Sequence, residues 1–517
     1  MRETEFLWGV ATSAYQAEGG YNRPDGPQNN WGELEAGGEV AVCGDAADFW
    51  HRYEEDFALA AGLGLNAFRL GVEWARVQPE RIPARAGLSC SPIDVLRPPA
   101  DGTEKTRPYD VAALDGYVRM LRACMRRGLE PVVTLHHFTH PSWLGSDPWL
   151  EESTAPLFAS HVRRLLEYIN PRLERPLRWL ITVNEPNMLV LNTYLGGLFP
   201  RAAAGGLGSA VRAISELLRA HVLAYGVIHQ LYRDRGWAAP QVSFNNYCSD
   251  LYWSDKMLLD LLCFRERRVP RAGLDTHIRE KASQFATAFR EARIPLHHDF
   301  AFHLGSAAKR VVDWLGIQKF RAEDFAPVLN AVEEMPQSGC LDFVGLDYYD
   351  PFLAHLLRLP VLWDHEFRHG SVPSWVMATV TSKWWDWRVL PRGLHFFCKE
   401  YARDFGRPVL IAENGMALRR RRGEEWHRHR RDRLKRSDFL RLQVHEVARI
   451  VKEGVPLLGY LHWSLFDNYE WGTYTPRFGL YTLNYDEGLG RVASDHLGDR
   501  APEAYADLIR EARRGWR

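Results

Sequence analysis

Two glutamate residues end apolar stretches of this sequence, and each has an asparagine as its neighbour. Glu185 lies in Thr-Val-Asn-Glu-Pro at residues 182–186, and Glu413 lies in Ile-Ala-Glu-Asn-Gly at residues 411–415. A carboxylate that follows a buried strand is costly unless it is paired, so each Glu is an exposed loop residue, a member of an ion pair or a functional group. Two carboxyl groups brought together can act as proton donor and nucleophile, which favours the functional interpretation.

The elements that must position these groups are eight short runs, most of them apolar and rich in β-branched and aromatic residues. Such runs are typical of strands buried on both faces, and here they span residues 6–13, 67–74, 131–138, 179–185, 241–247, 342–349, 408–413 and 457–465. Apolar residues at helical spacing lie between them, as at 111–127 and 439–453. Eight strand–helix units with right-handed crossovers predict an α/β fold, a single (β/α)8 TIM barrel.

The chain is long for such a barrel. A (β/α)8 barrel typically has about 250 residues, whereas this chain has 517. The excess is expected in elaborated loops at the C-terminal face of the strands, with candidates at 79–108, 265–321 and 419–436. No Pro/Ser-rich linker or internal repeat is present, so residues 1–517 are predicted to form one catalytic domain.

The composition excludes several classes of function. The 65 basic and 65 acidic residues balance, which argues against a nucleic-acid-binding surface. The sequence has no run of about 18 apolar residues, so no membrane span is predicted. It shows no secretory signal, which predicts a cytoplasmic protein. Seven scattered cysteines lack metal-binding spacing, and the 19 tryptophans suit both a large core and an aromatic-lined sugar site.

Five motifs in order resemble those of glycoside hydrolase family 1, the β-glucosidase family of (β/α)8 barrels. They are FLWGVATSAYQAEG at 6–19, TVNEP at 182–186, IAENG at 411–415, WSLFDNYEW at 463–471 and RFGL at 477–480. The resemblance runs from residue 6 to about residue 505, which is nearly the whole chain.

The resemblance implies that Glu185 is the acid/base and Glu413 the nucleophile of a retaining mechanism. We therefore expect the two carboxyl groups to lie about 5–5.5 Å apart, with the pKa of Glu185 raised and Glu413 ionised. Asn184 corresponds to the family's Asn that bonds the sugar 2-hydroxyl. Arg69 and Tyr349 correspond to the groups that hold the nucleophile, where a cation favours the charged carboxylate.

The resemblance also implies which residues bind substrate. Gln16, His137, Glu470 and Trp471 correspond to groups that hold the non-reducing sugar, with Trp463 as the surface on which that sugar stacks. Trp387 corresponds to the Trp that flanks the aglycone.

Five features depart from the family pattern. Phe138 replaces a Trp and loses an N–H donor. Asp347 replaces an Asn, so an extra carboxyl near Glu413 either stays protonated or raises its neighbour's pKa. His462 replaces a small or apolar residue and is predicted to be a hydrogen-bonded group behind the site. The segment 472–476 is one residue short, and 79–108 resembles an insertion.

The basic run at 419–436 permits two interpretations. It is either a solvated loop beside the entrance to the site, or a surface that attracts an anionic aglycone.

The predicted activity is hydrolysis of terminal non-reducing β-D-glucosyl residues through a covalent glycosyl-enzyme, with β-D-galactosyl and β-D-fucosyl residues as further candidates. The predicted partner is a small-molecule or oligosaccharide β-glycoside, and no metal or organic cofactor is expected because two carboxyl groups suffice. A transglycosylase on the same fold stays an alternative. A 6-phospho-β-glycosidase is disfavoured because Glu470 would repel a phosphate, and a non-catalytic sugar-binding barrel because both Glu185 and Glu413 are present. The sequence leaves the oligomeric state open.

Overall fold

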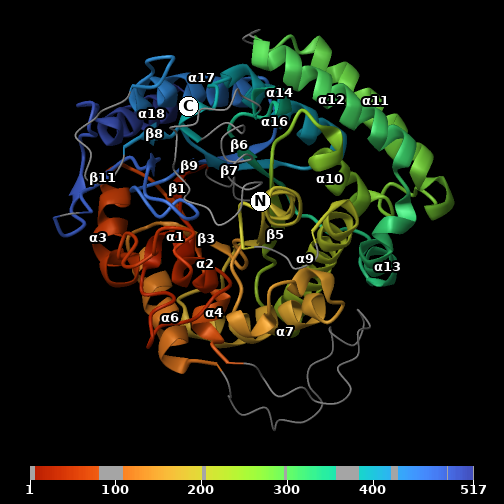
Figure 1. The fold of residues 1–517 in the computed structure, drawn as a ribbon. Coiled ribbons are helices and arrows are strands. Elements are labelled where there is room, and N and C mark those ends of the chain that lie inside the picture. Colours follow the sequence, from red (N-terminus) through yellow and green to blue (C-terminus); the bar gives the residue numbers. More distant parts are fainter. Residues whose placement is uncertain are drawn as a thin grey trace.

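Eight parallel strands close into a barrel, and helices surround it (Figure 1). The structure, a computed structural model, describes residues 6–80, 109–200, 205–295, 300–356, 384–420, 429–485 and 487–515. The barrel strands are β1 (Leu7–Ala11), β2 (Ala67–Gly71), β3 (Glu130–Thr134), β4 (Trp179–Asn184), β5 (Gln241–Tyr247), β6 (Val344–Tyr348), β7 (Val409–Asn414) and β9 (Leu457–Trp463). Each predicted run coincides with one strand to within a few residues, so the predicted TIM barrel is confirmed.

Eight main helices alternate with these strands along the chain. They are α3 (Phe49–Gly62), α6 (Val111–Arg126), α7 (Thr154–Ile169), α9 (Leu207–Asp234), α13 (Ala326–Glu334), α16 (Pro391–Phe405), α17 (Arg436–Lys452) and α18 (Ala501–Gly515). The two predicted helices correspond to α6 and α17, and α17 begins three residues earlier than the apolar spacing indicated.

Further elements elaborate the connections between strands and helices. They are α1 (Ala14–Glu18), α2 (Gly32–Ala36), α4 (Trp74–Val77), α8 (Pro186–Val190), α10 (Lys256–Cys263), α11 (Leu274–Glu291), α12 (Phe300–Lys319) and α14 (Leu353–Leu356), with the short strands β8 (Leu418–Arg419), β10 (Pro476–Arg477), β11 (Thr482–Leu483) and β12 (Arg491–Val492). The predicted loop at 265–321 thus contains the helices α11 and α12. Figure 1 shows both helices at the outer edge of the molecule. Much of 79–108 and 419–436 lies outside the described residues.

The strands form two apolar layers because their side chains alternate between the barrel interior and the helices. The interior cluster combines large and small side chains from most of the strands, among them Leu7, Ala11, Ala67, Val132, Trp179, Ile181, Leu410, Ala412, Leu461 and Trp463. A second and larger cluster packs the outer strand faces against the surrounding helices. The filled interior leaves the strand ends as the place where polar side chains can meet.

Six cysteines are free and buried, and Cys90 lies outside the described residues. The described helices include none long and apolar enough to cross a bilayer. The assignment of residues 1–517 to one domain stays a prediction.

Candidate active site

The carboxyl ends of β2, β4, β6 and β7 bring five polar side chains together. They are Arg69, Asn184, Glu185, Asp347 and Glu413, and all five are buried. The pairing register shifts near the ends of β4, β6 and β7, and such irregularities redirect side chains beside active sites. Glu185 follows β4 with a φ of 36°, a left-handed conformation that is uncommon for non-glycine residues and concentrates at functional sites.

Glu413 is held from two sides. Arg69 Nη1 donates to Glu413 Oε1 at 2.6 Å, and Tyr349 Oη donates to Oε2 at 2.9 Å. Arg69 is itself fixed because its Nη2 donates to Asn184 Oδ1 at 2.6 Å and its Nε to Thr134 Oγ1 at 2.9 Å. Burial raises the pKa of the Glu413 carboxyl, but Arg69 and the Tyr349 hydrogen bond oppose this shift. The contacts therefore favour the ionised form of Glu413.

The residues after Glu413 fix the end of β7. Asn414 Nδ2 donates to the Tyr348 carbonyl oxygen at 2.6 Å, and Tyr460 Oη donates to Asn414 Oδ1 at 2.8 Å. A Cβ on Gly415 would lie 2.3 Å from the Trp463 carbonyl oxygen. Glycine is thus required where the end of β7 passes β9, and this accounts for the Asn-Gly pair of the motif.

Glu185 contacts a second acidic residue, Asp347. Glu185 donates a hydrogen bond to Asp347, whose carboxylate also accepts one from Asn245 Nδ2. Burial, then the negative charges of Asp347 and Glu413, raise the pKa of Glu185 well above its ordinary value. Burial and Glu413 also raise the pKa of Asp347. The extra carboxyl group of Asp347 therefore raises the pKa of Glu185, and it is not among the causes that shift the pKa of Glu413.

Glu185, Asp347 and Glu413 form the one group of three candidate metal ligands within the described ranges, with a carboxylate oxygen of each within 4.8 Å of the others. Arg69 Nη1 already lies 2.6 Å from Glu413 Oε1 and 4.0 Å from Asp347 Oδ1. The guanidinium therefore supplies the positive charge that a cation would otherwise bring to this cluster.

Gln16 and Trp463 hold Glu470. Gln16 Nε2 donates to Glu470 Oε2 at 2.9 Å, and Trp463 Nε1 donates to Oε1 at 3.1 Å. Burial raises the pKa of Glu470 to about 8. The sequence-predicted residues Gln16, Trp463 and Glu470 are thus brought together as one fixed polar group.

His137 lies between two tryptophans and Asn184. Its ring is nearly parallel to Trp463 and Trp471, with centroids 5.8 and 5.6 Å away. Burial and the Arg69 charge hold the pKa of His137 well below its ordinary value, so the ring is neutral. Its Nε2 lies 3.2 Å from Asn184 Nδ2, which assigns the proton to Nδ1. That buried Nδ1 has no hydrogen-bond partner among the described residues.

Trp387 packs beside Tyr349, the hydrogen-bond partner of Glu413. Its ring centroid lies 5.3 Å from that of Tyr349 and 5.9 Å from that of Tyr247. Arg430 holds this segment by donating to the carbonyl oxygens of Trp385 at 3.0 Å and Trp387 at 2.6 Å. Arg430 belongs to the basic run but is buried, so it is neither solvated nor available to an anionic aglycone. Residues 421–428 of that run lie outside the described residues.

Two further departures from the family pattern, Phe138 and His462, lie in different parts of the structure. Phe138 has a φ of 68° and packs at 4.9 Å against Trp471, so it belongs to the aromatic group around His137. His462 lies between Phe439 and Tyr505 on the helix-facing side of β9. Burial lowers its pKa to about 3, so it is a neutral ring behind the site.

One residue of this network was missed in the sequence. Asn245, on β5, donates through Nδ2 to Asn184 Oδ1 at 2.6 Å and also to Asp347. Its signal was present, because Asn245 and Asn246 are polar residues near the end of a predicted strand, the same pattern that identified Glu185.

The sequence pattern described as glycosyl hydrolase family 1 matches residues 2–89, 101–249 and 299–496. The chain belongs to this family. It is therefore a glycosidase. The match omits residues 250–298, the segment of this family 1 member that contains α10 and α11.

The names of relatives in the family refer to glycosidases of both non-phosphorylated and phosphorylated sugars. Beta-glucosidase A of Thermotoga maritima is 26% identical over 492 residues, covering 93% of this chain and 92% of that protein. 6-phospho-beta-galactosidase 1 of Streptococcus pneumoniae is 26% identical over 513 residues, covering 93% and 94%.

Solved structures share the fold. The Thermotoga maritima beta-glucosidase in complex with castanospermine has a TM-score of 0.67 and 22% identity, covering 99% of this chain and 98% of its own. The beta-glycosidase from Pyrococcus horikoshii has a TM-score of 0.61 and 24% identity, covering 99% and 95%.

Proposed function

We propose that this family 1 glycosidase hydrolyses terminal non-reducing β-D-glucosyl residues with retention of configuration, Glu185 acting as acid/base and Glu413 as nucleophile. β-D-Galactosyl and β-D-fucosyl residues are further candidate substrates. The name of the Thermotoga relative supports a glucosyl substrate.

The observation that carries the proposal is the approach of the two glutamates. Carboxylate oxygens of Glu185 and Glu413 lie within 4.8 Å of each other. Retaining glycosidases have their carboxyl groups about 5–5.5 Å apart, whereas inverting enzymes leave about 6.5–9.5 Å for a water molecule. The short separation supports direct attack by Glu413 on the sugar.

The environments of the two carboxyl groups suit different roles. The raised pKa of Glu185 keeps its proton at neutral pH, so Glu185 can protonate the departing glycosidic oxygen. Arg69 favours the ionised Glu413, which attacks the anomeric carbon while the C–O bond to the aglycone breaks. Glu185, now a carboxylate, then takes a proton from water, and that water's oxygen displaces Glu413 from the anomeric carbon.

Sugar recognition is assigned to the polar groups around His137 and Glu470. His137 Nδ1 and Trp387 Nε1 are buried without partners among the described residues, and a bound ligand would satisfy such donors. Asn184 already contacts Arg69 and His137, so a bond from it to the 2-hydroxyl would couple the sugar to the nucleophile's own partner.

An aryl β-glucoside tests the proposal. We expect Glu413→Gln to lower kcat by about 10³-fold or more. Glu185→Gln should slow poor leaving groups far more than activated ones in the first step. Glu511→Gln, an exposed change on α18, is the matched control. The first-formed anomer, followed by NMR, should be β; an α product, or full activity of Glu413→Gln, would contradict the assignment.

A further inference from the structure

A cavity of about 210 Å³ lies beside the proposed acid/base, between α8, the end of β5 and the first turns of α9, α10 and α14. Its walls are mostly apolar, with Met188, Ile214, Trp253, Met257 and Leu353 among them. The cavity reaches the surface at Leu195, a lining residue that is 48% exposed. A cavity with this lining favours an apolar ligand.

The cavity adjoins the side of the site that the aglycone must occupy. Met188 follows Glu185 by three residues, on α8, and the leaving group departs toward the residue that protonates it. Tyr247 forms part of the cavity wall. Its ring stacks on Tyr349 with centroids 5.9 Å apart, and Tyr349 in turn bonds Glu413. The ring of Tyr247 therefore separates the cavity from Tyr349, which is the hydrogen-bond partner of the proposed nucleophile Glu413.

Part of the cavity wall comes from residues 250–298, which the family pattern does not match. Trp253, Met257 and Leu258 belong to this segment. This part of the cavity wall therefore lies outside the matched family pattern.

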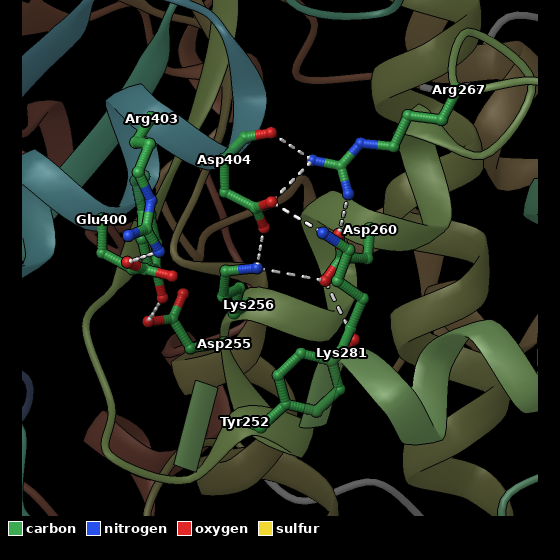
Figure 2. Close-up of polar contacts among 10 residues, drawn as sticks. Tyr252, Asp255, Lys256, Asp260, Arg267, Lys281, Glu400, Arg403 and Asp404 are labelled. Carbon is green, nitrogen blue, oxygen red and sulfur yellow. Dashed lines mark hydrogen bonds and ion pairs between the residues drawn. The ribbon is translucent and has the colours of Figure 1, made fainter. Parts of the chain in front are cut away.

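An ion-pair network holds this part of the cavity wall in place (Figure 2). Lys256, on α10, pairs with Asp260 at 3.4 Å and also with Asp404 at the end of α16. Lys281 of α11 pairs with Asp404 at 2.7 Å, and Arg267 pairs with Asp260 at 2.6 Å. These contacts tie α10 and α11 to a helix of the barrel, so the cavity is a fixed feature of the fold.

We propose that the cavity is a binding site for the hydrocarbon chain of an amphiphilic β-glycoside, with the sugar at Glu413 and the chain passing Tyr247. This inference rests on the proposed function, because it takes Glu185 as the group that protonates the leaving oxygen. An alkyl chain fits better than a second sugar, since sugar hydroxyls would lose water without gaining enough partners from such a lining.

A series of alkyl β-glucosides from methyl to octyl, each below its micelle-forming concentration, tests the inference. We expect kcat/KM to rise by about two- to fourfold per methylene until the cavity is filled. Val211→Trp should fill the cavity from α9, and Leu195→Gln should make its mouth polar. Both should flatten the chain-length dependence and leave the methyl glucoside unchanged.

Leu442→Gln, at another exposed leucine on α17 (41%, against 48% for Leu195), is the matched control and should keep the native slope. If Val211→Trp fails to fold, the exposed substitution Leu195→Gln still tests whether the chain-length dependence arises from the cavity. A flat native series with normal methyl glucoside turnover would overturn the inference alone, whereas no turnover of any β-glucoside would overturn the proposed function. A native slope that survives in a folded Val211→Trp variant would also overturn the cavity assignment.

Discussion

Glu185 donates a hydrogen bond to Asp347, so the proposed acid/base shares its proton with a third buried carboxyl group. Arg69 lies 2.6 Å from Glu413 but 4.0 Å from Asp347. The single guanidinium thus neutralises Glu413 first, and the remaining two carboxyl groups are left to share a proton. Such a pair titrates as a unit, with one proton held to higher pH than an isolated carboxyl group would allow.

Asp347→Asn should therefore move the pH profile. The charge of Asp347 raises the pKa of Glu185, so its removal should lower that pKa. The basic limb of kcat/KM against pH reports loss of the acid's proton and should shift to lower pH by about one unit. Asp507→Asn, an exposed change on α18, should leave the profile unchanged. An unshifted basic limb in Asp347→Asn would show that the pair does not set the proton affinity.

Arg69 variants test the acidic limb of the pH profile of kcat/KM. Arg69→Met removes the charge that favours ionised Glu413, so the acidic limb should move to higher pH and kcat/KM should fall by about 10²–10³-fold. Arg69→Lys keeps the charge but cannot reach Glu413, Asn184 and Thr134 together, so it should recover only part of the loss. Arg510→Lys on the surface of α18 is the matched control. Equal rates for Arg69→Met and Arg69→Lys would contradict a role for the charge.

Much of the fold and of the candidate site could be predicted from the sequence, because strand ends and motifs depend on residues that are close together in the chain. The eight runs located the barrel strands, and Glu185 and Glu413 were found because each polar group interrupts an apolar stretch. Asp347 stood out as a departure from the family pattern. Its pairing with Glu185 could not be predicted, since it depends on where two strand ends lie across the barrel.

Other features required the assembled fold. The composition of the basic run at 419–436 gave no sign that Arg430 is buried under Trp387, because burial depends on segments far apart in the chain. The apolar cavity is formed by side chains from several separate elements, each of which alone resembles ordinary core.

Glu470 provides a test of the phosphorylated-sugar alternative raised by the Streptococcus relative. Its partners Gln16 and Trp463 are neutral, and a phosphate placed there would meet a carboxyl group. We expect kcat/KM for an aryl 6-phospho-β-galactoside to be about 10²-fold or more below that for the plain galactoside. Glu470→Gln should weaken the plain glucoside by about 10-fold or more, since buried sugar hydroxyls lose a partner. Faster cleavage of the phosphorylated substrate would reverse the substrate assignment.

Asp404→Asn should loosen the part of the cavity wall that α10 supplies. Burial opposes the charge of Asp404, but Lys256 and then Lys281 and Arg267 outweigh it and hold the pKa of this carboxyl well below its ordinary range. A depressed folded-state pKa contributes stability above the unfolded-state pKa of about 4, and that contribution is lost as the pH falls through the lower folded value. We expect the variant to be less stable by roughly 2–4 kcal/mol at pH 7, because it leaves Lys256 with Asp260 alone.

Thermal unfolding at pH 7 and at pH 3 checks this, with Asp438→Asn, an exposed pair member on α17, as the control. The gap in stability between native protein and Asp404→Asn should narrow as the pH falls below about 4, because Asp404 then takes up a proton in the unfolded chain while it keeps its charge in the folded protein. The same variant should keep its turnover of methyl β-glucoside and lose part of its preference for octyl β-glucoside, because α10 supplies Met257 and Leu258 to the cavity. A destabilised variant with an unaltered chain-length slope would separate the ion-pair network from the cavity and show that α10 keeps its place without Asp404.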